Sequence, residues 1–333
     1  MVSTLLAGDI GGTWSRLALF EVADGRLQMR DHERYPSEQH AGLAEIAQRF
    51  LAVRPQSVQR ACFGVAGPVH GGRVHTTNLP WNVDATDLAR ATGLAAVDLI
   101  NDLEATVYGL PALGPADFAV LNTGAPDAAG NQAVIAAGTG LGEAGIFWDG
   151  QRAHPLATEG GHADFAPRND LEIELLRYLL PRFGHVSVER VVSGPGLCHI
   201  YEFLRDTGRG AESGAVRQEM ERDDPPAVIT RRALAGADDL CVQALTLFVS
   251  LYGAEAGNLA LKVMATGGVF VGGGIAPRIV ETLRGPGFMA SFTAKGRHQA
   301  LLAAIPVRVV LNDGAALLGA AHYAALRAAL MGD

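Results

Sequence analysis

The sequence predicts an α/β protein with two domains. Two stretches, 4–21 and 133–148, share one pattern in which an apolar run leads into a glycine-rich turn and a second apolar run follows. Elsewhere, short apolar runs alternate with segments of helical spacing, which is typical of an α/β fold. The chain has 333 residues, a length that is ample for two domains.

The first stretch ends its first strand at Gly8-Asp9, turns at Gly11-Gly12-Thr13 and resumes at 17–20. A strand follows this turn, whereas a dinucleotide-binding βαβ unit requires a helix whose N-terminus faces the phosphates. Backbone N–H groups in such a turn can still surround phosphate oxygens, because glycine lets the backbone approach closely. The turn is therefore a candidate phosphate site of another kind.

The second stretch repeats this pattern with a turn at Gly138-Thr139-Gly140-Leu141-Gly142, between apolar runs at 133–137 and 144–148. A phosphate-binding hairpin is thus predicted in each half of the chain. The repeat predicts that ligands bind in a cleft between two α/β domains.

The remaining elements follow in chain order. A helix is predicted over 43–53 and short buried strands over 61–66 and 97–100. The segment 105–124 is rich in Pro, Gly and Ala, with breaks at Pro111, Gly114 and Pro115, and is the predicted crossing between domains. In the second half we expect helices over 170–180 and 231–265, an exposed turn-rich segment over 207–226, a strand over 306–311 and a helix over 314–330 that returns to the first domain.

Composition excludes several classes of function. The formal net charge of -8 argues against a nucleic-acid partner. The only lysines, Lys262 and Lys295, do not follow a glycine-rich loop, which excludes P-loop NTPases and the catalytic machinery of protein kinases. Cys62, Cys198 and Cys241 lack the spacing of a zinc site or a disulfide framework.

The chain starts without a basic leader, and we expect no bilayer-spanning run, so the predicted location is the cytoplasm, without a membrane partner.

Two polar positions follow predicted strands. Asp9 ends the first strand, where a carboxylate beside a phosphate site can hold Mg2+ and its waters; its alternative role is to start an Asx turn. Asn101-Asp102 follows the strand at 97–100, and Asp102 is the candidate base that accepts a proton from a hydroxyl nucleophile in phosphoryl transfer. The alternative is that this pair caps the next helix, and one residue could do each job.

Polar and glycine-rich positions in the second half are candidate ligand contacts. Glu159-Gly160-Gly161-His162 places a carboxylate and an imidazole around two glycines, which suits a polyhydroxylated ligand such as a sugar; the alternative is a solvated polar turn. Glu189 lies ahead of a predicted turn at 193–196, where a solvated helix-face Glu is the alternative. The cluster Gly272-Gly273-Gly274 follows a short strand and can pass under a nucleotide, or be a simple loop.

Several short motifs occur together and in one order along nearly the whole chain. They are Gly8 to Thr13, Thr77-Asn78 with Trp81, Ile100-Asn101-Asp102, Gly138 to Gly142, Glu159 to His162 followed by Asp164-Phe165-Ala166-Pro167, Glu189 to Gly196, and Gly267 to Pro277. With these motifs the chain resembles the bacterial glucokinase family, the non-repressor branch of the sugar kinases. That family has a two-domain actin-like ATPase (ribonuclease H-like) fold.

The resemblance implies phosphorylation of glucose at its 6-hydroxyl by ATP and Mg2+, in a homodimer. It implies a small domain, 1–112 plus 313–333, and a large domain, 113–312, that close over glucose. Asp102 is the implied base, and Asp9 the implied holder of Mg2+ through water. The implied glucose contacts are Asn101, Asp102, Glu159, His162 and Glu189. The implied ATP contacts are Gly8, Asp9, Ile10, Gly11, Gly12, Thr13, Gly138, Thr139, Gly140, Gly272, Gly273 and Gly274.

One position departs from the family pattern, because Trp14 stands where the family commonly has Asn after Gly-Gly-Thr. A side-chain hydrogen bond made there to phosphate is lost or replaced. The chain lacks both the cysteine-rich zinc motif of the repressor-type kinases and an N-terminal helix-turn-helix. Two alternatives to glucose phosphorylation stay open: a kinase for another hexose or an amino sugar, and a sugar-responsive binding protein without turnover.

Overall fold

The chain divides into two compact units. A computed structural model describes residues 3–23, 26–54, 57–76 and 79–331. Unit 1 comprises Met1–Gly114 and Asn312–Asp333, and unit 2 comprises Pro115–Leu311. The Thr77-Asn78 part of the family motif lies outside the described residues.

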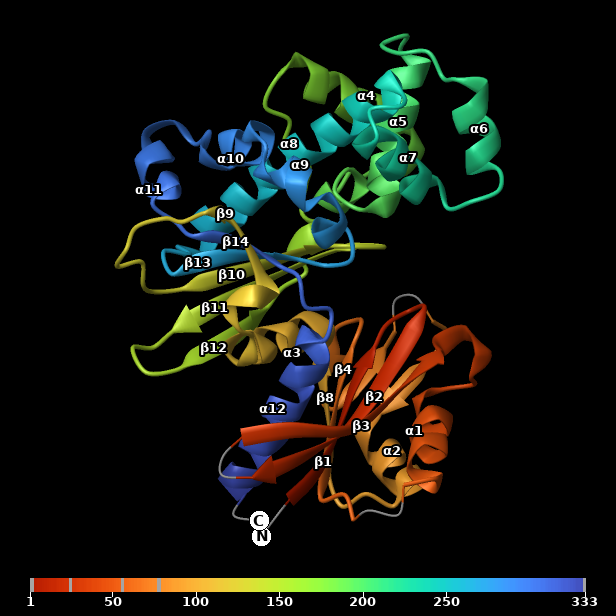
Figure 1. Cartoon of the computed structure of the whole chain (residues 1–333), viewed down its shortest axis with the longest axis vertical. Coiled ribbons are helices and arrows are strands. Elements are labelled where there is room, and N and C mark those ends of the chain that lie inside the picture. Colours follow the sequence, from red (N-terminus) through yellow and green to blue (C-terminus); the bar gives the residue numbers. More distant parts are fainter. Residues whose placement is uncertain (1–2, 24–25, 55–56, 77–78, 332–333) are drawn as a thin grey trace. The chain divides into compact units, whose positions relative to one another are not determined.

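Unit 1 is built on a five-stranded sheet in the order β3-β2-β1-β4-β8 (Figure 1). Its strands are β1 (Ser3–Ile10), β2 (Trp14–Ala23), β3 (Arg26–Pro36), β4 (Arg60–Val65) and β8 (Val97–Asn101). The strands β1, β2 and β3 form an antiparallel meander, whereas β1, β4 and β8 are parallel, with Ile10 beside Val65 and Val65 beside Asn101. The carboxyl ends of β1 and β8, which carry Asp9 and Asn101, therefore lie at the same end of this sheet.

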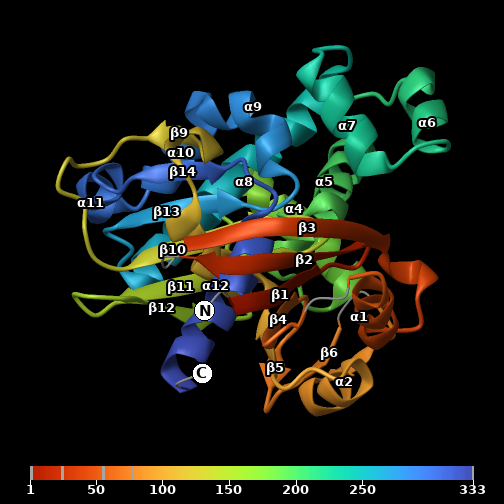
Figure 2. The same ribbon diagram turned by 60° about the horizontal axis from the view of Figure 1, so that its bottom comes forward.

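Helices cover both faces of the unit 1 sheet. One face packs against α1 (Leu43–Ala52) and α2 (Ala85–Thr92), and the other against α3 (Asp102–Gly109) and α12 (Ala315–Met331). Figure 2 shows α1 and α2 together and separate from α12. The helices α3 and α12 touch through glycines, since a Cβ on Gly319 would overlap the Ala105 carbonyl oxygen. A small sheet of β5 (Val69–His70), β6 (Arg73–His75) and β7 (Asn82–Asp84) completes the unit.

Unit 2 has a six-stranded sheet in the order β12-β11-β10-β13-β14-β9. Its strands are β9 (Phe118–Asn122), β10 (Gln132–Ala137), β11 (Leu141–Trp148), β12 (Ala153–Ala157), β13 (Gly268–Gly272) and β14 (Val307–Val310). The three central strands β10, β13 and β14 are parallel. The helices are α4 (Asp170–Phe183), α5 (Gly194–Asp206), α6 (Gly214–Met220), α7 (Pro225–Leu234), α8 (Asp239–Val263), α9 (Val280–Arg284), α10 (Pro286–Thr293) and α11 (Gln299–Ala303).

The helix α8 is the centre of the unit 2 core. It packs against β10, β11 and β13 on one side and against α5, α7 and α10 on the others. Its 25 residues are long and apolar enough to cross a membrane, so the expectation that no run reaches that length is wrong. However, 78% of its most apolar window is buried inside the unit, which is how the core helix of a globular fold behaves.

Four predicted segments differ from the structure. The helix expected over 231–265 is two helices, because the chain turns at Gly236 with φ +60° and Asp238 then caps α8 through the Cys241 amide. The expected crossing at 105–124 contains most of α3 and the strand β9, and the exposed segment at 207–226 contains α6. The turn expected at 193–196 is the start of α5, where Ser193 Oγ accepts from the Gly196 amide at 3.0 Å.

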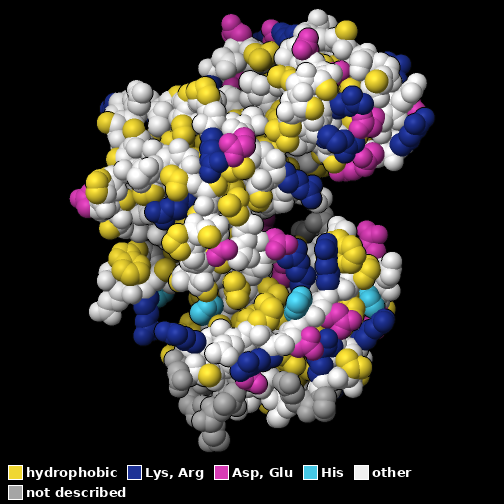
Figure 3. Space-filling model, viewed as in Figure 1, with side chains coloured by type: hydrophobic (Ala, Val, Ile, Leu, Met, Phe, Trp, Pro, Cys, Tyr) yellow, Lys and Arg dark blue, Asp and Glu magenta, His cyan; other side chains and the backbone are white. Residues whose placement is uncertain are grey.

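Charged side chains are interspersed on the described surface. On the face drawn in Figure 3, acidic and basic side chains lie side by side on both units. The three cysteines are free thiols, with Cys62 and Cys241 buried and Cys198 partly buried.

Candidate active site

Acidic side chains gather near the end of strand β1 in unit 1. Asp9 on β1 is the register partner of Arg16 on β2. The Arg16 guanidinium pairs with Asp313 at 2.7 Å and donates to the Asp313 carbonyl oxygen at 2.9 Å. Burial raises the pKa of Asp9 to about 6; the charge of Arg16 opposes this rise, and the charges of Asp102 and Asp313 add to it. Three carboxylates and one guanidinium therefore share one electrostatic environment beside the first glycine turn.

Hydrogen bonds from Ser37, directly after β3, hold the first glycine turn in place. Ser37 Oγ donates to the Gly11 carbonyl oxygen at 2.8 Å, and the Ser37 amide donates to the Thr13 carbonyl oxygen at 3.0 Å. Sequence reasoning missed Ser37, because it lies 26 positions from the turn that it holds. Trp14 stacks against Arg34, whose guanidinium carbon lies 3.8 Å from the ring centroid, and remains 38% exposed.

Asn101 has the capping role that the sequence offered to this pair. Asn101 is the N-cap of α3, since its Oδ1 accepts from the amides of Leu103 at 2.9 Å and Glu104 at 3.4 Å. Its amide nitrogen also donates to the Gly67 carbonyl oxygen at 3.1 Å, which fixes the side chain on both sides. Asp102 is the first helical residue and is partly exposed, with Oδ1 accepting from the Leu103 amide at 2.9 Å.

The second glycine turn, in unit 2, is bonded directly to Glu189. The Leu141 amide donates to Glu189 Oε2 at 2.9 Å, and a Cβ on Gly140 would lie 2.5 Å from the same oxygen. The turn closes on itself through the Gly138 amide and the Gly140 carbonyl oxygen at 2.8 Å. Glu189, a predicted sugar contact, is therefore hydrogen-bonded to the turn that is the second predicted phosphate site. A side chain at position 140 would displace the Glu189 carboxylate.

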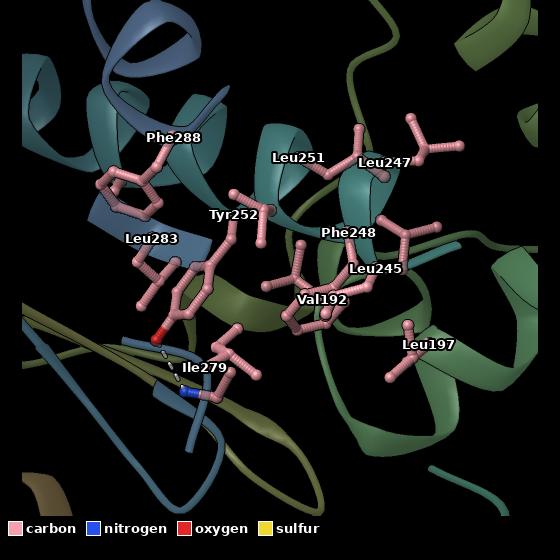
Figure 4. Packing of buried hydrophobic residues seen from close by; sticks show 14 of the residues in the cluster. Val192, Leu197, Leu245, Leu247, Phe248, Leu251, Tyr252, Ile279, Leu283 and Phe288 are labelled. Atoms are coloured by element: carbon pink, nitrogen blue, oxygen red, sulfur yellow. Dashed lines mark hydrogen bonds between the residues drawn. The ribbon is translucent and has the colours of Figure 1, made fainter. Parts of the chain in front are cut away.

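A buried tyrosine supports the strands that lead into the glycine segments of unit 2. Tyr252 on α8 points its hydroxyl at the sheet, where it accepts from the Ala137 amide at 3.1 Å, between Ile279 and Leu283 (Figure 4). The same oxygen lies 3.2 Å from the Gly272 carbonyl oxygen, at the end of β13. Tyr252 thus holds the beginnings of both the 138–142 turn and the 272–274 turn. The signal for it in the sequence is a tyrosine in an apolar helix, because its hydroxyl needs a partner when buried.

The tetrad Glu159-Gly160-Gly161-His162 forms a short 3-10 turn. Its two polar side chains are each 60% exposed, with His162 Nε2 and Glu159 Oε2 4.0 Å apart. Its glycines lie against β11, since a Cβ on Gly160 would overlap the Glu143 carboxylate and one on Gly161 would overlap the Leu141 carbonyl oxygen. The close approach expected at these glycines is therefore an approach to β11, and it leaves the polar side chains available to a ligand.

Each unit gathers its own share of the predicted residues. Unit 1 brings Asp9, Asn101 and Asp102 to one end of its sheet. Unit 2 brings Glu189 to the Gly138–Gly142 turn and sets the tetrad on the strand that follows. Within the described residues, no group of three His, Cys, Asp or Glu side chains has the arrangement of a metal cage. That is compatible with Mg2+, which commonly uses one or two carboxylates, phosphate oxygens and water.

Comparison with known proteins decides the family. A family model described as Glucokinase matches residues 6–327. A glucokinase from a Nostoc species is 43% identical over 340 residues, which cover 97% of this chain and 99% of that protein. The chain belongs to the glucokinase family. The predicted resemblance is thereby confirmed, as is the prediction of an enzyme of the glucokinase type.

Solved structures confirm the fold. The crystal structure of a glucokinase from an Antarctic psychrotroph has a TM-score of 0.83 and 33% identity, covering 97% of this chain and 99% of that one. A ROK family glucokinase from Streptomyces griseus, solved in complex with glucose and AMPPNP, has a TM-score of 0.63 and 20% identity, covering 98% of this chain and 100% of that one. The predicted actin-like ATPase fold of the sugar kinases is therefore the fold of this chain.

Proposed function

We propose that this enzyme transfers the γ-phosphoryl group of ATP to the 6-hydroxyl of glucose, with Asp102 as the general base. ATP-dependent phosphorylation of glucose is the activity of the family to which the chain belongs. The position of Asp102 supports its role: it follows β8, it is partly exposed, and it lies near enough to Asp9 for its charge to act on that carboxyl group. An Asp that accepts the hydroxyl proton and orients the nucleophile is the recurring solution in phosphoryl transfer.

Side chains from both units are proposed to hold glucose. Asn101 and Asp102 contribute from unit 1, and Glu159, His162 and Glu189 from unit 2. The exposure of Glu159 and His162 supports this, because both carry hydrogen-bonding atoms that protein partners leave accessible. The bond from the Leu141 amide to Glu189 adds a mechanical link, since a sugar that orders Glu189 also orders the turn proposed to hold phosphate.

Asp9 is proposed to hold Mg2+ through water, beside the ATP phosphates. The chemistry of this corner of unit 1 fits, because a carboxylate lies at a glycine turn with two further acidic side chains in electrostatic range. Bound Mg2+ neutralises charge that develops on the phosphoryl oxygens. The Gly8–Thr13 and Gly138–Gly140 segments are the proposed phosphate contacts, and Gly272–Gly274 the proposed adenosine contacts, with the left-handed Gly273 (φ +81°) packed against Ala137.

The test is the pair Asp102→Asn and Asp102→Ala, measured with glucose and MgATP in a coupled assay. Loss of a general base costs about 10²- to 10⁴-fold in kcat. The matched control is Asp87→Asn, which removes an exposed carboxylate on α2 that pairs with Arg90. Turnover of either Asp102 variant within threefold of the unmodified enzyme, on the order of measurement scatter, is incompatible with the proposed role.

A panel of sugars and phosphoryl donors separates the remaining alternatives. Glucose is expected to give the highest kcat/KM among hexoses and amino sugars, because discrimination by hydroxyl contacts is strong when a pocket is built for them. If glucose raises thermal stability while no sugar is phosphorylated, the chain is a sugar-responsive binding protein. A cytoplasmic homodimer completes the proposal, and sedimentation of the purified enzyme tests its oligomeric state.

A further inference from the structure

Two buried carboxyl groups face each other beneath the tetrad in unit 2. Glu143 on β11 is 2% exposed and Glu255 on α8 is 5% exposed. A third buried carboxylate, Glu172, is neutralised by the guanidinium of Arg168, which donates to it at 3.1 Å through Nε. Buried charges normally have such a partner, because an isolated charge is costly to remove from water. The pair Glu143 and Glu255 needs a different explanation.

The nearby lysine Lys262 pairs with Glu255 and not with Glu143. Glu255 accepts from Lys262 at 3.3 Å and from Asn258 at 2.8 Å. Lys295 bonds to Asn258 and donates to the Ala254 carbonyl oxygen at 2.9 Å. Both lysines of the chain are thus committed to the Glu255 side of the pair. In the part of the chain that the structure describes, Glu143 Oε1 has no hydrogen-bond partner.

The lack of a partner at Glu143 is explained by a neutral carboxyl group. Burial raises the pKa of Glu143 to about 8, the negative charge of Glu255 adds to the rise, and Lys262 opposes it. The other charged groups of this neighbourhood are Arg168 and Glu172, which act on Lys295, and the exposed Glu159 and His162 of the tetrad itself. Near neutral pH, Glu143 is therefore protonated.

The tetrad rests directly on Glu143. A Cβ on Gly160 would overlap Glu143 Oε2 and would lie 2.9 Å from its carboxyl carbon, so the backbone of Gly160 is packed against this group. Thr158 connects the same two segments, since its hydroxyl donates to the Glu143 carbonyl oxygen at 2.7 Å and accepts from the Gly160 amide at 3.1 Å. A displacement of the Glu143 carboxyl group must therefore move Gly160, and with it Glu159 and His162.

We propose that Glu143 is a positioning residue for glucose: its neutral carboxyl group supports the tetrad, and loss of its proton displaces Glu159 and His162 and weakens glucose binding. Two carboxylates facing each other in a buried site repel, and the backbone of Gly160 packs against the Glu143 carboxyl group. The inference rests on the proposed assignment of the tetrad to glucose. It adds a residue that acts through the tetrad without touching the sugar.

The test is the KM for glucose, separated from kcat, between pH 7 and pH 9.5. The unmodified enzyme is expected to show a rising KM above pH 8, approaching about tenfold per pH unit, because binding then requires uptake of one proton. Glu143→Gln keeps the shape of the neutral side chain and is expected to remove that rise while retaining the KM at pH 7. The matched control Glu281→Gln changes an exposed glutamate, paired with Arg284, and should keep the rise.

A second variant changes the other carboxyl group of the buried pair. Glu255→Gln removes the negative charge that repels an ionised Glu143, so the rise in KM should be smaller than in the unmodified enzyme. A KM profile of Glu143→Gln that matches the unmodified enzyme, or a rise in KM that Glu255→Gln leaves unchanged, overturns the inference. If His162→Ala and Glu159→Gln leave the KM for glucose unchanged, the assignment of the tetrad itself is wrong, and that outcome is distinct from the other two.

Thermal stability gives a readout that does not need activity. The folded-state pKa of Glu143 lies above its ordinary value of 4.5, so folding retains a proton that the unfolded chain releases. This proton makes stability fall as pH rises from 4.5 towards 8. Glu143→Gln removes that part of the slope, so its Tm relative to the unmodified enzyme should increase over this interval. A constant difference in Tm from pH 5 to pH 8 contradicts the buried proton.

Discussion

The two glycine turns have the same backbone plan but different surroundings. Each joins two antiparallel strands, β1 to β2 in unit 1 and β10 to β11 in unit 2. The first is surrounded by charge, with Asp9, Arg16 and Asp313 close to it. The second is bonded to the carboxylate of Glu189 and closes on itself through the Gly138 amide and the Gly140 carbonyl oxygen. The duplicated pattern in the sequence therefore gives two sites with different chemical capacities.

This difference indicates that the two units have different functions in the reaction. The charged surroundings of the first turn suit a metal ion and a proton acceptor, the functions proposed for Asp9 and Asp102. The second turn continues into β11, on which the tetrad rests and to which Glu189 is bonded through Leu141. We infer that unit 1 supplies the charge for phosphoryl transfer and that unit 2 links recognition of the sugar to the position of its phosphate turn.

Removal of Asp9 tests the charged turn and has the largest expected effect. Loss of a group that holds a metal through water typically costs about 10- to 100-fold in metal affinity. Asp9→Ala is therefore expected to raise the KM for MgATP by that factor, with a smaller change in the KM for glucose. Steady-state kinetics with Mg2+ titrated at fixed ATP measures both, with Asp87→Ala as the exposed control on α2. If the KM for glucose rises instead, the inferred assignment of different functions to the two turns is wrong.

Gly160→Ala tests the uncharged side of the comparison and should have an intermediate effect. The new Cβ would overlap the Glu143 carboxyl group, and overpacking of this kind costs about 1 to 3 kcal/mol. We expect the KM for glucose to rise roughly tenfold, which corresponds to about 1.4 kcal/mol, while the KM for MgATP changes little. Gly214→Ala is the control, because a Cβ on Gly214 meets nothing within 4 Å. An equal rise in both KM values indicates general disruption of unit 2.

Local patterns in the sequence were sufficient for the parts of the site that are contiguous. The strand, turn and strand arrangement around Asp9, the strand before Asn101 and the start of α3 follow from apolar runs and helix-capping residues. The signal for α5 was also present, since Ser193 followed by Gly194-Pro195 is an N-cap with proline in the first turn, but the glycines favoured a turn instead. Glycine occurs both in turns and at the start of a helix, and only tertiary contacts distinguish the two cases.

Contacts between distant segments were not predictable from these patterns. Tyr252 lies 115 positions from Ala137, and Glu143 is one charged residue on an apolar strand until the fold places Glu255 opposite it. The glycines of the tetrad were expected to approach a ligand, whereas they approach β11. In each case the residue is selected by a partner from another element. A single sequence carries no period or spacing that reveals such a partner.

Trp14→Asn has the smallest expected effect and tests whether the first turn has lost a contact to phosphate. Asn is the residue that the family commonly has at this position, and its amide can donate one hydrogen bond, worth about 0.5 to 1.5 kcal/mol. We therefore expect the KM for ATP to fall by up to about tenfold, with kcat unchanged. Arg34→Gln is the matched variant, because it removes the cation stacked on Trp14 and leaves the turn intact. If Arg34→Gln lowers the KM for ATP equally, the effect comes from release of the indole ring. If neither variant changes it, the backbone of the turn alone holds the phosphate, and the two turns are more alike than their side chains indicate.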